Sequence, residues 1–308
     1  MAFFFSASAL ANAFGGVLAY GIHHMDGIGG LEAWRWLFLL EGIPTVLLGV
    51  VVFYFLPDSP SAVAWLSDTE KEYTNAHLKE DDASVGAAHG WPQVKELALH
   101  YRIYFHCLIQ IGMTIPNYTI AFLLPTVVKD MGFSTLFSQL LSAPPNVLGM
   151  LVCLAVAYNS DRVQERGLHV ALPAIAAALG FILIAAVHHQ ATQYAMLFII
   201  TAGINGCNVV NLSWLANNVP NKTQRAVATA TVIAMGNIGG IIAGQMYRHN
   251  EAPRYLGSHL ANASVLLCLT FSLSLSLKFL LRRHNRALYT EKGSKGDLPS
   301  LNPPHYMT

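Results

Sequence analysis

The chain has 308 residues, of which 54% are hydrophobic and only 11% are charged. A soluble domain typically carries about 25% charged residues, so this composition excludes a disordered chain, a nucleic-acid-binding surface and a disulfide-stapled secreted scaffold. A soluble enzyme is also disfavoured, because so few charges cannot cover a globule of this size. The net charge is +1, and the positions of the charges carry more information than their sum.

Eight apolar stretches dominate the chain. A bilayer core about 30 Å thick needs a helix of about 20 apolar residues to cross it. The stretches are residues 2–22, 36–56, 103–124, 136–158, 168–187, 194–214, 226–246 and 257–277. Among them they hold one formally charged residue, Glu41. The pattern predicts an all-α membrane protein, a polytopic helical bundle in the lipid bilayer.

The first stretch has an alternative interpretation as a cleaved signal peptide that ends at Ala13. A signal peptide begins with a basic segment, which is missing from this sequence. The apolar run also continues to Ile22, so a membrane span is the favoured interpretation.

The basic residues predict the orientation of the spans, because cytoplasmic connections carry an excess of Lys and Arg. Eight spans place both chain ends on one side, together with the connections at 57–102, 159–167 and 215–225. That side holds 14 of the 18 Lys and Arg residues: Lys71, Lys79, Lys95, Arg102, Arg162, Arg166, Lys222, Arg225, Lys278, Arg282, Arg283, Arg286, Lys292 and Lys295. We therefore expect both termini in the cytoplasm.

A long polar connection divides the chain into unequal parts. The expected parts are two spans in 1–56, a cytoplasmic loop in 57–102, a six-helix bundle in 103–281 and a cytoplasmic tail in 282–308. Within the loop, Ser67 and Glu70 have the spacing of a capping box. This spacing predicts the start of a short surface helix.

Several segments, taken in chain order, resemble those of one transporter family. They are Trp34-Arg35-Trp36-Leu37-Phe38 before Glu41-Gly42-Ile43-Pro44, Leu56-Pro57-Asp58-Ser59-Pro60, Phe122-Leu123-Leu124-Pro125, Ser160-Asp161-Arg162 with Arg166, Trp214-Leu215-Ala216-Asn217-Asn218, Arg225-Ala226, and Gly236-Asn237-Ile238-Gly239-Gly240. Together they resemble a fungal transporter of the major facilitator superfamily. The most similar branch is that of the anion:cation symporters, with allantoate permease and the vitamin and organic-acid permeases.

The resemblance implies twelve spans in two six-helix halves, of which this chain would supply about eight, numbers five to twelve. The 57–102 connection then corresponds to the central loop. The implied function is secondary active transport of a small organic anion or carboxylate with protons across the plasma membrane, by alternating access. The alternative is a non-transporting membrane protein, either a remnant or a partner subunit, because the first four spans would be absent.

Glu41 is the candidate for proton coupling. An ionisable residue inside a span is rare, usually faces the bundle interior or a cavity, and can take part in a proton relay. The structural alternative is a fixed partner for a helix N-terminus or a neighbouring hydroxyl group.

A polar stripe in the sixth span is the main candidate for the substrate path. Thr201, Asn205 and Asn208 fall within about 60° of arc, and Asn211 lies about 60° further round the helix. Hydrocarbon supplies no hydrogen-bond partner. The stripe therefore either contacts an organic anion or bonds neighbouring helices.

A second substrate-path candidate lies in the third span. Asn117 and Tyr118 follow Pro116, which frees a backbone carbonyl group where a cavity or a neighbouring helix must satisfy it. His106 in the same span is interpreted as a packed or interfacial histidine, because no other His, Cys or acidic residue shares its face.

Small residues in two spans predict close helix packing. In the seventh span the repeat consists of Gly236, Gly240 and Gly244, which allows another helix to approach. Asn237 lies beside this face and is a further candidate for the substrate path. The first span carries a similar stripe of Ser8, Asn12 and Gly16.

Charged residues between the fourth and fifth spans form the candidate gate, made of Asp161, Arg162 and Arg166. In the family that the chain resembles, similar motifs form a charge lock, and a pair that breaks and reforms suits a two-state gate. The structural alternative is a turn with positive-inside arginines. Arg225, at the start of the seventh span, either attracts an anionic substrate or anchors its helix.

No motif predicts catalysis, a cofactor or a metal site. The four cysteines are dispersed over four spans, without the spacing of a metal site or a redox motif. The sequence also lacks a P-loop, a G-x-S-x-G turn and an H-E-x-x-H helix. We therefore expect no enzyme activity, no cofactor and no nucleic-acid partner.

Overall fold

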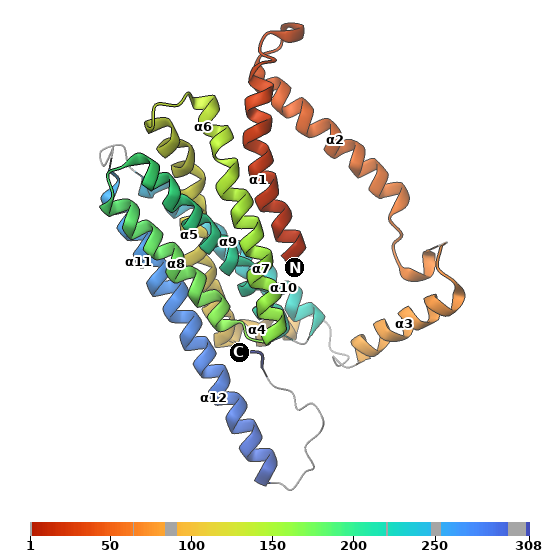
Figure 1. Ribbon diagram of the computed structural model, residues 1–308. Coiled ribbons are helices and arrows are strands. Elements are labelled where there is room, and N and C mark those ends of the chain that lie inside the picture. The colour runs from red at the N-terminus through yellow and green to blue at the C-terminus, as the bar shows by residue number, and fades with distance from the viewer. Residues whose placement is uncertain (1, 64, 84–90, 220, 248–253, 295–305) are drawn as a thin grey trace.

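The computed structural model describes residues 2–63, 65–83, 91–219, 221–247, 254–294 and 306–308 (Figure 1). Within these residues every regular element is a helix, which confirms the all-α prediction. The elements are α1 (Ala2–His23), α2 (Ala33–Phe55), α3 (Asp68–Ala83), α4 (Trp91–Leu99), α5 (Tyr101–Asp130), α6 (Thr135–Leu141), α7 (Ala143–Val163), α8 (Gly167–Ala186), α9 (Gln190–Asn217), α10 (Lys222–Met246), α11 (Leu256–Val265), a π-helical turn (Leu266–Phe271) and α12 (Ser272–Ser294).

Seven helical stretches in the described part of the chain are long and apolar enough to cross a membrane. They comprise α2, α5, α8, α9, α10, a stretch that runs from α6 through α7, and a stretch of 32 residues from Leu256 to Ala287. The eighth expected span is α1, a helix of 22 residues that is not among these seven. At 1.5 Å per residue, a helix of this length extends about 33 Å, which matches the bilayer core.

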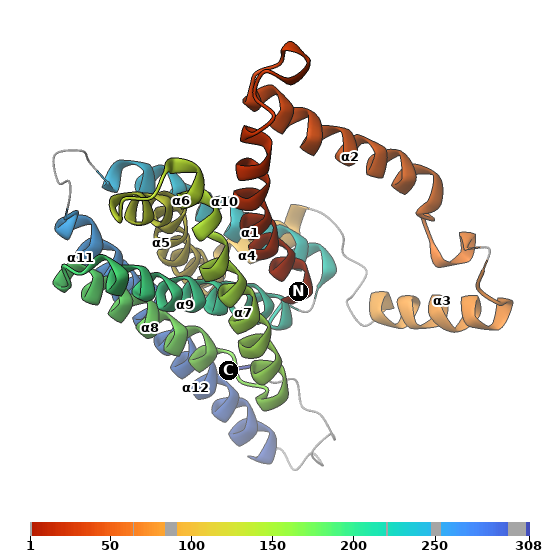
Figure 2. The same ribbon diagram turned by 45° about the horizontal axis from the view of Figure 1, so that its top comes forward.

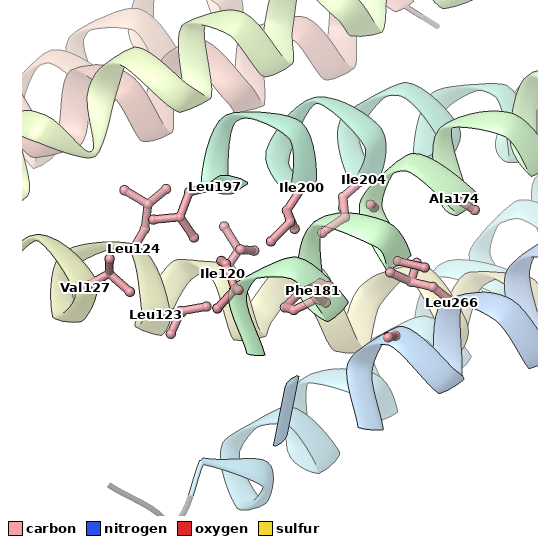
Figure 3. Close-up of a cluster of buried hydrophobic side chains, with 14 residues drawn as sticks. Ile120, Leu123, Leu124, Val127, Ala174, Phe181, Leu197, Ile200, Ile204 and Leu266 are labelled. Carbon is pink, nitrogen blue, oxygen red and sulfur yellow. The ribbon is translucent and has the colours of Figure 1, made fainter. Parts of the chain in front are cut away.

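The core of the bundle lies between α5, α8, α9 and the α11 region. Figure 3 shows apolar side chains from all four meeting in one cluster, with Phe181 of α8 between Ile120 of α5 and Leu266. The cluster also includes Ile200 and Ile204 of α9, which are fully buried. Because lipid tails are as apolar as these side chains, close packing rather than hydrophobic burial must hold the helices together.

Glycines provide this close packing between α8 and α9. A Cβ atom added to Gly203 would lie 2.5 Å from the backbone oxygen of Pro173 and 2.9 Å from the Cβ atom of Ala177. A Cβ atom on Gly180 would lie 2.5 Å from Ile200 Cγ1. The two helices therefore approach more closely than any larger residue at these positions permits.

The glycine face of α10 packs against α5, as its spacing predicts. Gly236 lies against Gln110 of α5, and Gly240 lies against Tyr118 of α5. The prediction is wrong for the third member, Gly244, because nothing lies within 4 Å of the position that its Cβ atom would take. Its place in the contact is taken by Gly239, because a helix face is wider than one strict four-residue repeat.

The two N-terminal spans behave differently from each other. Helix α1 packs against α6 and α7, and Gly16 allows the backbone of α1 to reach the carbonyl group of Gln139. Helix α2 stands away from the bundle in both views (Figures 1 and 2) and buries none of its residues. Its exposed surface is almost entirely apolar.

The predicted capping box in the long connection is confirmed. The backbone N–H of Ser67 donates to Glu70 Oε2 at 2.9 Å, and the backbone N–H of Glu70 donates to Ser67 Oγ at 3.4 Å. These reciprocal bonds satisfy N–H groups at the start of α3. The hydrogen bonds from Ser67 also lower the pKa of the Glu70 carboxyl group below its ordinary value.

The packing of α8 on α9 gives a testable prediction for two glycine variants. We expect Gly203→Ala to lower the free energy of unfolding by about 1–3 kcal/mol, because its new methyl group meets a backbone atom that cannot turn aside. Gly244→Ala adds the same group in open space and should cost nothing measurable. Thermal unfolding of both variants in detergent compares them, and equal midpoints would contradict the packing described here.

Candidate functional site

A polar cavity of about 370 Å³ lies between α1 and the bundle. Five helices supply its walls: α1, α5, α6, α7 and α9. Its polar lining residues are Ser8, Asn12, Asn117, Tyr118, Gln139, Ser142, Asn146, Thr201 and Asn205. The lining contains hydroxyl and amide groups and no formally charged side chain among the described residues.

The sequence predicted substrate-path residues on two of the five walls. The structure brings Asn117 and Tyr118 of α5 together with Asn205 of α9, and it places opposite them the small stripe of α1, which was predicted only to pack closely. The sequence analysis did not predict the walls on α6 and α7, which carry Gln139, Ser142 and Asn146. Their spacing of three and four residues is that of one helix face, and this spacing was the available signal.

The amide groups around the cavity are fixed by backbone contacts. Asn205 Nδ2 donates to the carbonyl oxygen of Thr201 at 2.9 Å, and Asn146 Nδ2 donates to that of Ser142 at 2.9 Å. Thr201 Oγ1 is buried and has no hydrogen-bond partner in the part of the chain that the structure describes. A buried hydroxyl group without a partner costs about 1–3 kcal/mol, which a ligand or a water molecule in the cavity would offset.

The C-terminal part of the predicted stripe on α9, Asn208 and Asn211, forms hydrogen bonds to α5 and does not line the cavity. Asn211 Oδ1 lies 2.8 Å from Nδ1 of His106, and Asn211 Nδ2 donates to Gln110 Oε1 at 2.9 Å. Gln110 Nε2 in turn donates to Asn208 Oδ1 at 2.9 Å. This chain of hydrogen bonds joins α5 to α9 across the bundle. His106 is therefore a packed histidine, and its ring meets Trp214 edge to face at 5.3 Å.

Three further candidates lie away from the cavity. Glu41 is exposed on α2, where its carbonyl oxygen accepts from Thr45 Oγ1 at 2.7 Å. Asn237 is exposed on α10. Arg225 lies in the first turn of α10, and its Nε donates to the carbonyl oxygen of Val219 at 3.0 Å. The structure therefore does not bring these residues together with the asparagines of the cavity.

The candidate gate lies at the lower end of the bundle, defined as the end drawn at the bottom of Figure 1, where α7 ends and α8 begins. The guanidinium group of Arg166 forms an ion pair with Asp161 and donates to Ser160 Oγ at 3.1 Å. Arg166 is buried, whereas Arg162 is exposed. The structure therefore assembles two of the three predicted gate residues.

A second ion pair at the lower end escaped sequence reasoning. Lys278 of α12 contacts Glu165 Oε1 at 2.6 Å, and His169 Nδ1 lies 3.0 Å from Glu165 Oε2. Both partners of the Glu165–Lys278 pair are buried. Burial raises the pKa of Glu165, but Lys278, the backbone N–H of Leu168 and His169 together outweigh this effect and hold that pKa below its ordinary value.

The buried pair gives a prediction about pH and stability. Because the folded-state pKa of Glu165 is lowered, its stabilisation is present above the unfolded value and is lost as the pH falls through the folded value. We expect Glu165→Gln to cost about 3 kcal/mol at pH 7, because it leaves Lys278 buried without a carboxylate. Thermal unfolding in detergent between pH 7 and pH 3 measures both effects.

The control for this prediction is the exposed pair of Lys71 with Asp68, at 3.7 Å. An exposed ion pair contributes at most about 1 kcal/mol, so Asp68→Asn should leave the unfolding midpoint nearly unchanged. Equal losses in the two variants would show that the burial of Glu165 does not matter.

Several known proteins are similar in sequence to this chain. A family model described as Major Facilitator Superfamily matches residues 1–244. MFS transporter prlL of Fungal sp. (strain NRRL 50135) is 34% identical over 271 residues, which cover 86% of this chain and 55% of the relative. MFS-type transporter cnsO of Penicillium expansum is 33% identical over 269 residues, 83% of this chain and 52% of the relative. An uncharacterized transporter of Schizosaccharomyces pombe is 31% identical over 288 residues, which cover 93% of this chain and 57% of the relative.

The chain spans about half the length of the curated relatives that it matches. Those relatives are named as transporters. The family match covers α1 and α2 and nearly all of the bundle through α10. Together with the apolar spans and the polar cavity among them, it shows that the chain belongs to the major facilitator superfamily.

Proposed function

We propose that the chain acts in secondary active transport of a small carboxylate together with a proton across the plasma membrane, by alternating access. The observation that carries the proposal is the uncharged polar cavity between α1 and the bundle. Substrate sites of secondary transporters lie near the midplane, where separate groups of helices meet. A cavity of about 370 Å³ falls in the size range of small-molecule sites.

The chemistry of the cavity favours a substrate that enters without net charge. Its amide and hydroxyl groups donate hydrogen bonds, but no lysine or arginine lines it in the described residues. A carboxylate buried without a countercharge is expensive. A carboxylate that travels with a proton avoids this cost, so the neutral lining supports proton symport of an organic acid. The proposed branch remains that of the fungal anion:cation symporters, with substrates like those of allantoate or organic-acid permeases.

The proposed proton carrier is Glu41, the one formally charged residue in the eight expected spans. It lies on the exposed face of α2 and does not line the cavity. In this proposal Glu41 takes up and releases the coupled proton on α2, and the acid that receives the proton is bound in its neutral form by the cavity on the other helices. Arg225 stays as a secondary proposal for attracting the anion, whereas Asn237 is exposed on α10 and does not line the cavity.

The proposed gate is the ion pair of Asp161 with Arg166, assisted by Arg162. The pair is formed in this structure, and a state in which it is broken would open the lower end. The excess of basic residues supports a cytoplasmic position for the lower end and for both termini. A gate of this kind works because its contacts differ in free energy between the two states.

The alternative function is that of a partner subunit that does not transport alone. The observation that favours it is α2, an apolar helix that buries none of its residues in this structure. A cavity walled on one side by α1 only would then be completed by helices of another chain. Uptake by cells that express this chain alone separates the two functions.

The cavity gives a prediction about two matched asparagine variants. We expect Asn117→Ala to reduce uptake of a labelled organic acid about tenfold, because it removes a hydrogen bond worth about 1–1.5 kcal/mol to the substrate. Asn237→Ala removes the same group from an exposed position on α10 and should leave uptake unchanged. Equal uptake by both variants would contradict the proposal that the substrate passes through the cavity. No uptake by the unchanged chain would favour the partner subunit.

Proton symport predicts that uptake by the unchanged chain rises as the external pH falls. In Glu41→Gln the group that would carry the proton can no longer release it, so the pH dependence should flatten while binding of the substrate persists. Initial uptake rates between pH 5 and pH 8, with substrate binding measured separately, test this assignment. A Glu41→Gln profile that follows the unchanged chain would exclude Glu41 as the carrier.

A further inference from the structure

The segment Tyr306–Thr308 lies in a groove at the lower end of the bundle, near the C label in Figure 1. The groove is bounded by the start of α5, the end of α9, α12 and the connection between α7 and α8. Nothing in the transport proposal accounts for the segment, although its backbone makes six hydrogen bonds to these elements.

Two asparagine side chains from different helices hold the backbone of the segment. Asn285 of α12 donates to the carbonyl oxygen of Tyr306 at 2.7 Å and accepts from its N–H at 2.9 Å. Asn218, which caps α9, donates to the carbonyl oxygen of Met307 at 3.0 Å and accepts from its N–H at 2.9 Å. Each side-chain amide therefore pairs with the N–H and C=O groups of one residue, as a residue of a neighbouring antiparallel β-strand would.

Two more donors complete the backbone contacts. Trp214 Nε1 donates to the carbonyl oxygen of Met307 at 2.8 Å, and the backbone N–H of Arg166 donates to the main-chain oxygen of Thr308 at 2.6 Å. Trp214 is fully buried, so its N–H group would lose a partner if the segment left. In this structure the hydrogen-bond acceptor of the Trp214 N–H group is therefore supplied by the docked segment.

The side chains of the segment add selectivity. The guanidinium group of Arg102 stacks 3.6 Å from the centre of the Tyr306 ring, which is a cation–π contact. The thioether sulfur of Met307 accepts from Arg166 Nε at 3.2 Å and from Asn217 Nδ2 at 3.2 Å. The groove therefore suits an aromatic residue followed by a thioether residue.

The segment and the candidate gate share one residue. Arg166 holds Asp161 through its guanidinium group, while its Nε and its backbone N–H hold Met307 and Thr308. A segment that stays docked therefore fixes the position of the gate arginine. It also ties the end of α9 to α12 through Asn218 and Asn285.

We propose that the lower end carries a peptide-binding site, that its ligand is the chain's own Tyr306–Thr308 segment, and that the docked segment is a latch that holds the gate closed. The peptide-binding site does not depend on the proposed transport function. The role of the segment as a latch does rest on that function. The eleven residues 295–305 tether the segment, so docking is intramolecular and a free peptide must compete with an effective concentration on the order of millimolar.

Hydrogen exchange of the purified chain in detergent tests the site. We expect the amides of Tyr306 and Met307 to exchange at least tenfold more slowly than in an unstructured peptide, because both donate to asparagine side chains. The double variant Asn218→Ala, Asn285→Ala should abolish this protection. The matched control is Thr308→Ala, since only the backbone of Thr308 is used. Unprotected amides in the unchanged chain would overturn the proposal.

A chain that lacks residues 306–308 gives a second measurement. A synthetic peptide Pro-Pro-His-Tyr-Met-Thr, matching residues 303–308, should bind this shortened chain and bind the full chain at least tenfold more weakly, because there the site is occupied. Replacing the tyrosine of the peptide by alanine should abolish binding, whereas phenylalanine should preserve it. Equal binding to both chains would overturn the site.

The latch role has its own readout, which needs no transport. Ser213 lines a cavity beside Asp161, Arg166 and Asn217, so a cysteine introduced there reports access to the gate. With exposed Cys268 replaced by serine, maleimide labelling of Ser213→Cys should become several-fold faster without residues 306–308, and the peptide should slow it again. Protected amides with unchanged labelling would keep the site and overturn the latch. Failed uptake with faster labelling would overturn the transport function, and with it the role of the latch in transport, but would support the peptide-binding site and its effect on access to the gate residues.

Discussion

The structure depends on one constraint, which is that hydrocarbon offers no hydrogen-bond partner to a polar side chain. Each polar group within the spans must therefore meet another protein group or face a cavity that admits water or a ligand. The asparagines of α9 illustrate both solutions on a single helix. Asn211 and Asn208 are consumed in the network with Gln110 and His106, whereas Asn205 reaches the cavity wall.

A second property of the bilayer, that lipid tails are as apolar as the side chains, explains why close packing matters more than apolar content. Glycines bring α8 to α9 and α10 to α5 within backbone contact, and the polar network then locks α5 to α9. Gly16 extends this principle to α1, which it brings against Gln139 of α6. The cavity exists because α1 is held close at that point while its neighbours Ser8 and Asn12 face Asn117 and Asn205 across a gap.

Apart from Glu41, the formally charged residues lie outside the eight expected spans, and two ion pairs meet at the lower end. Glu165 with Lys278 and Asp161 with Arg166 form two adjacent ion pairs on the α7–α8 connection. Arg166 also holds the segment that contains Met307. A connection that would otherwise be a simple turn thus joins α7, α8, α12 and the end of the chain described here. The proposed gate requires two discrete arrangements of this junction.

The sequence by itself determined the helical class, most of the spans, the capping box of Ser67 with Glu70, and the faces that carry Asn117 and Asn205. These features follow from hydrophobic length and helical period, which are local properties of the chain. Only the tertiary structure decided which partner each face meets. It divided the α9 stripe between a network and a cavity, and it paired Lys278 with Glu165 across more than a hundred residues. Periodicity assigns a residue to a face, but contacts between distant segments depend on how the helices pack, which no local pattern encodes.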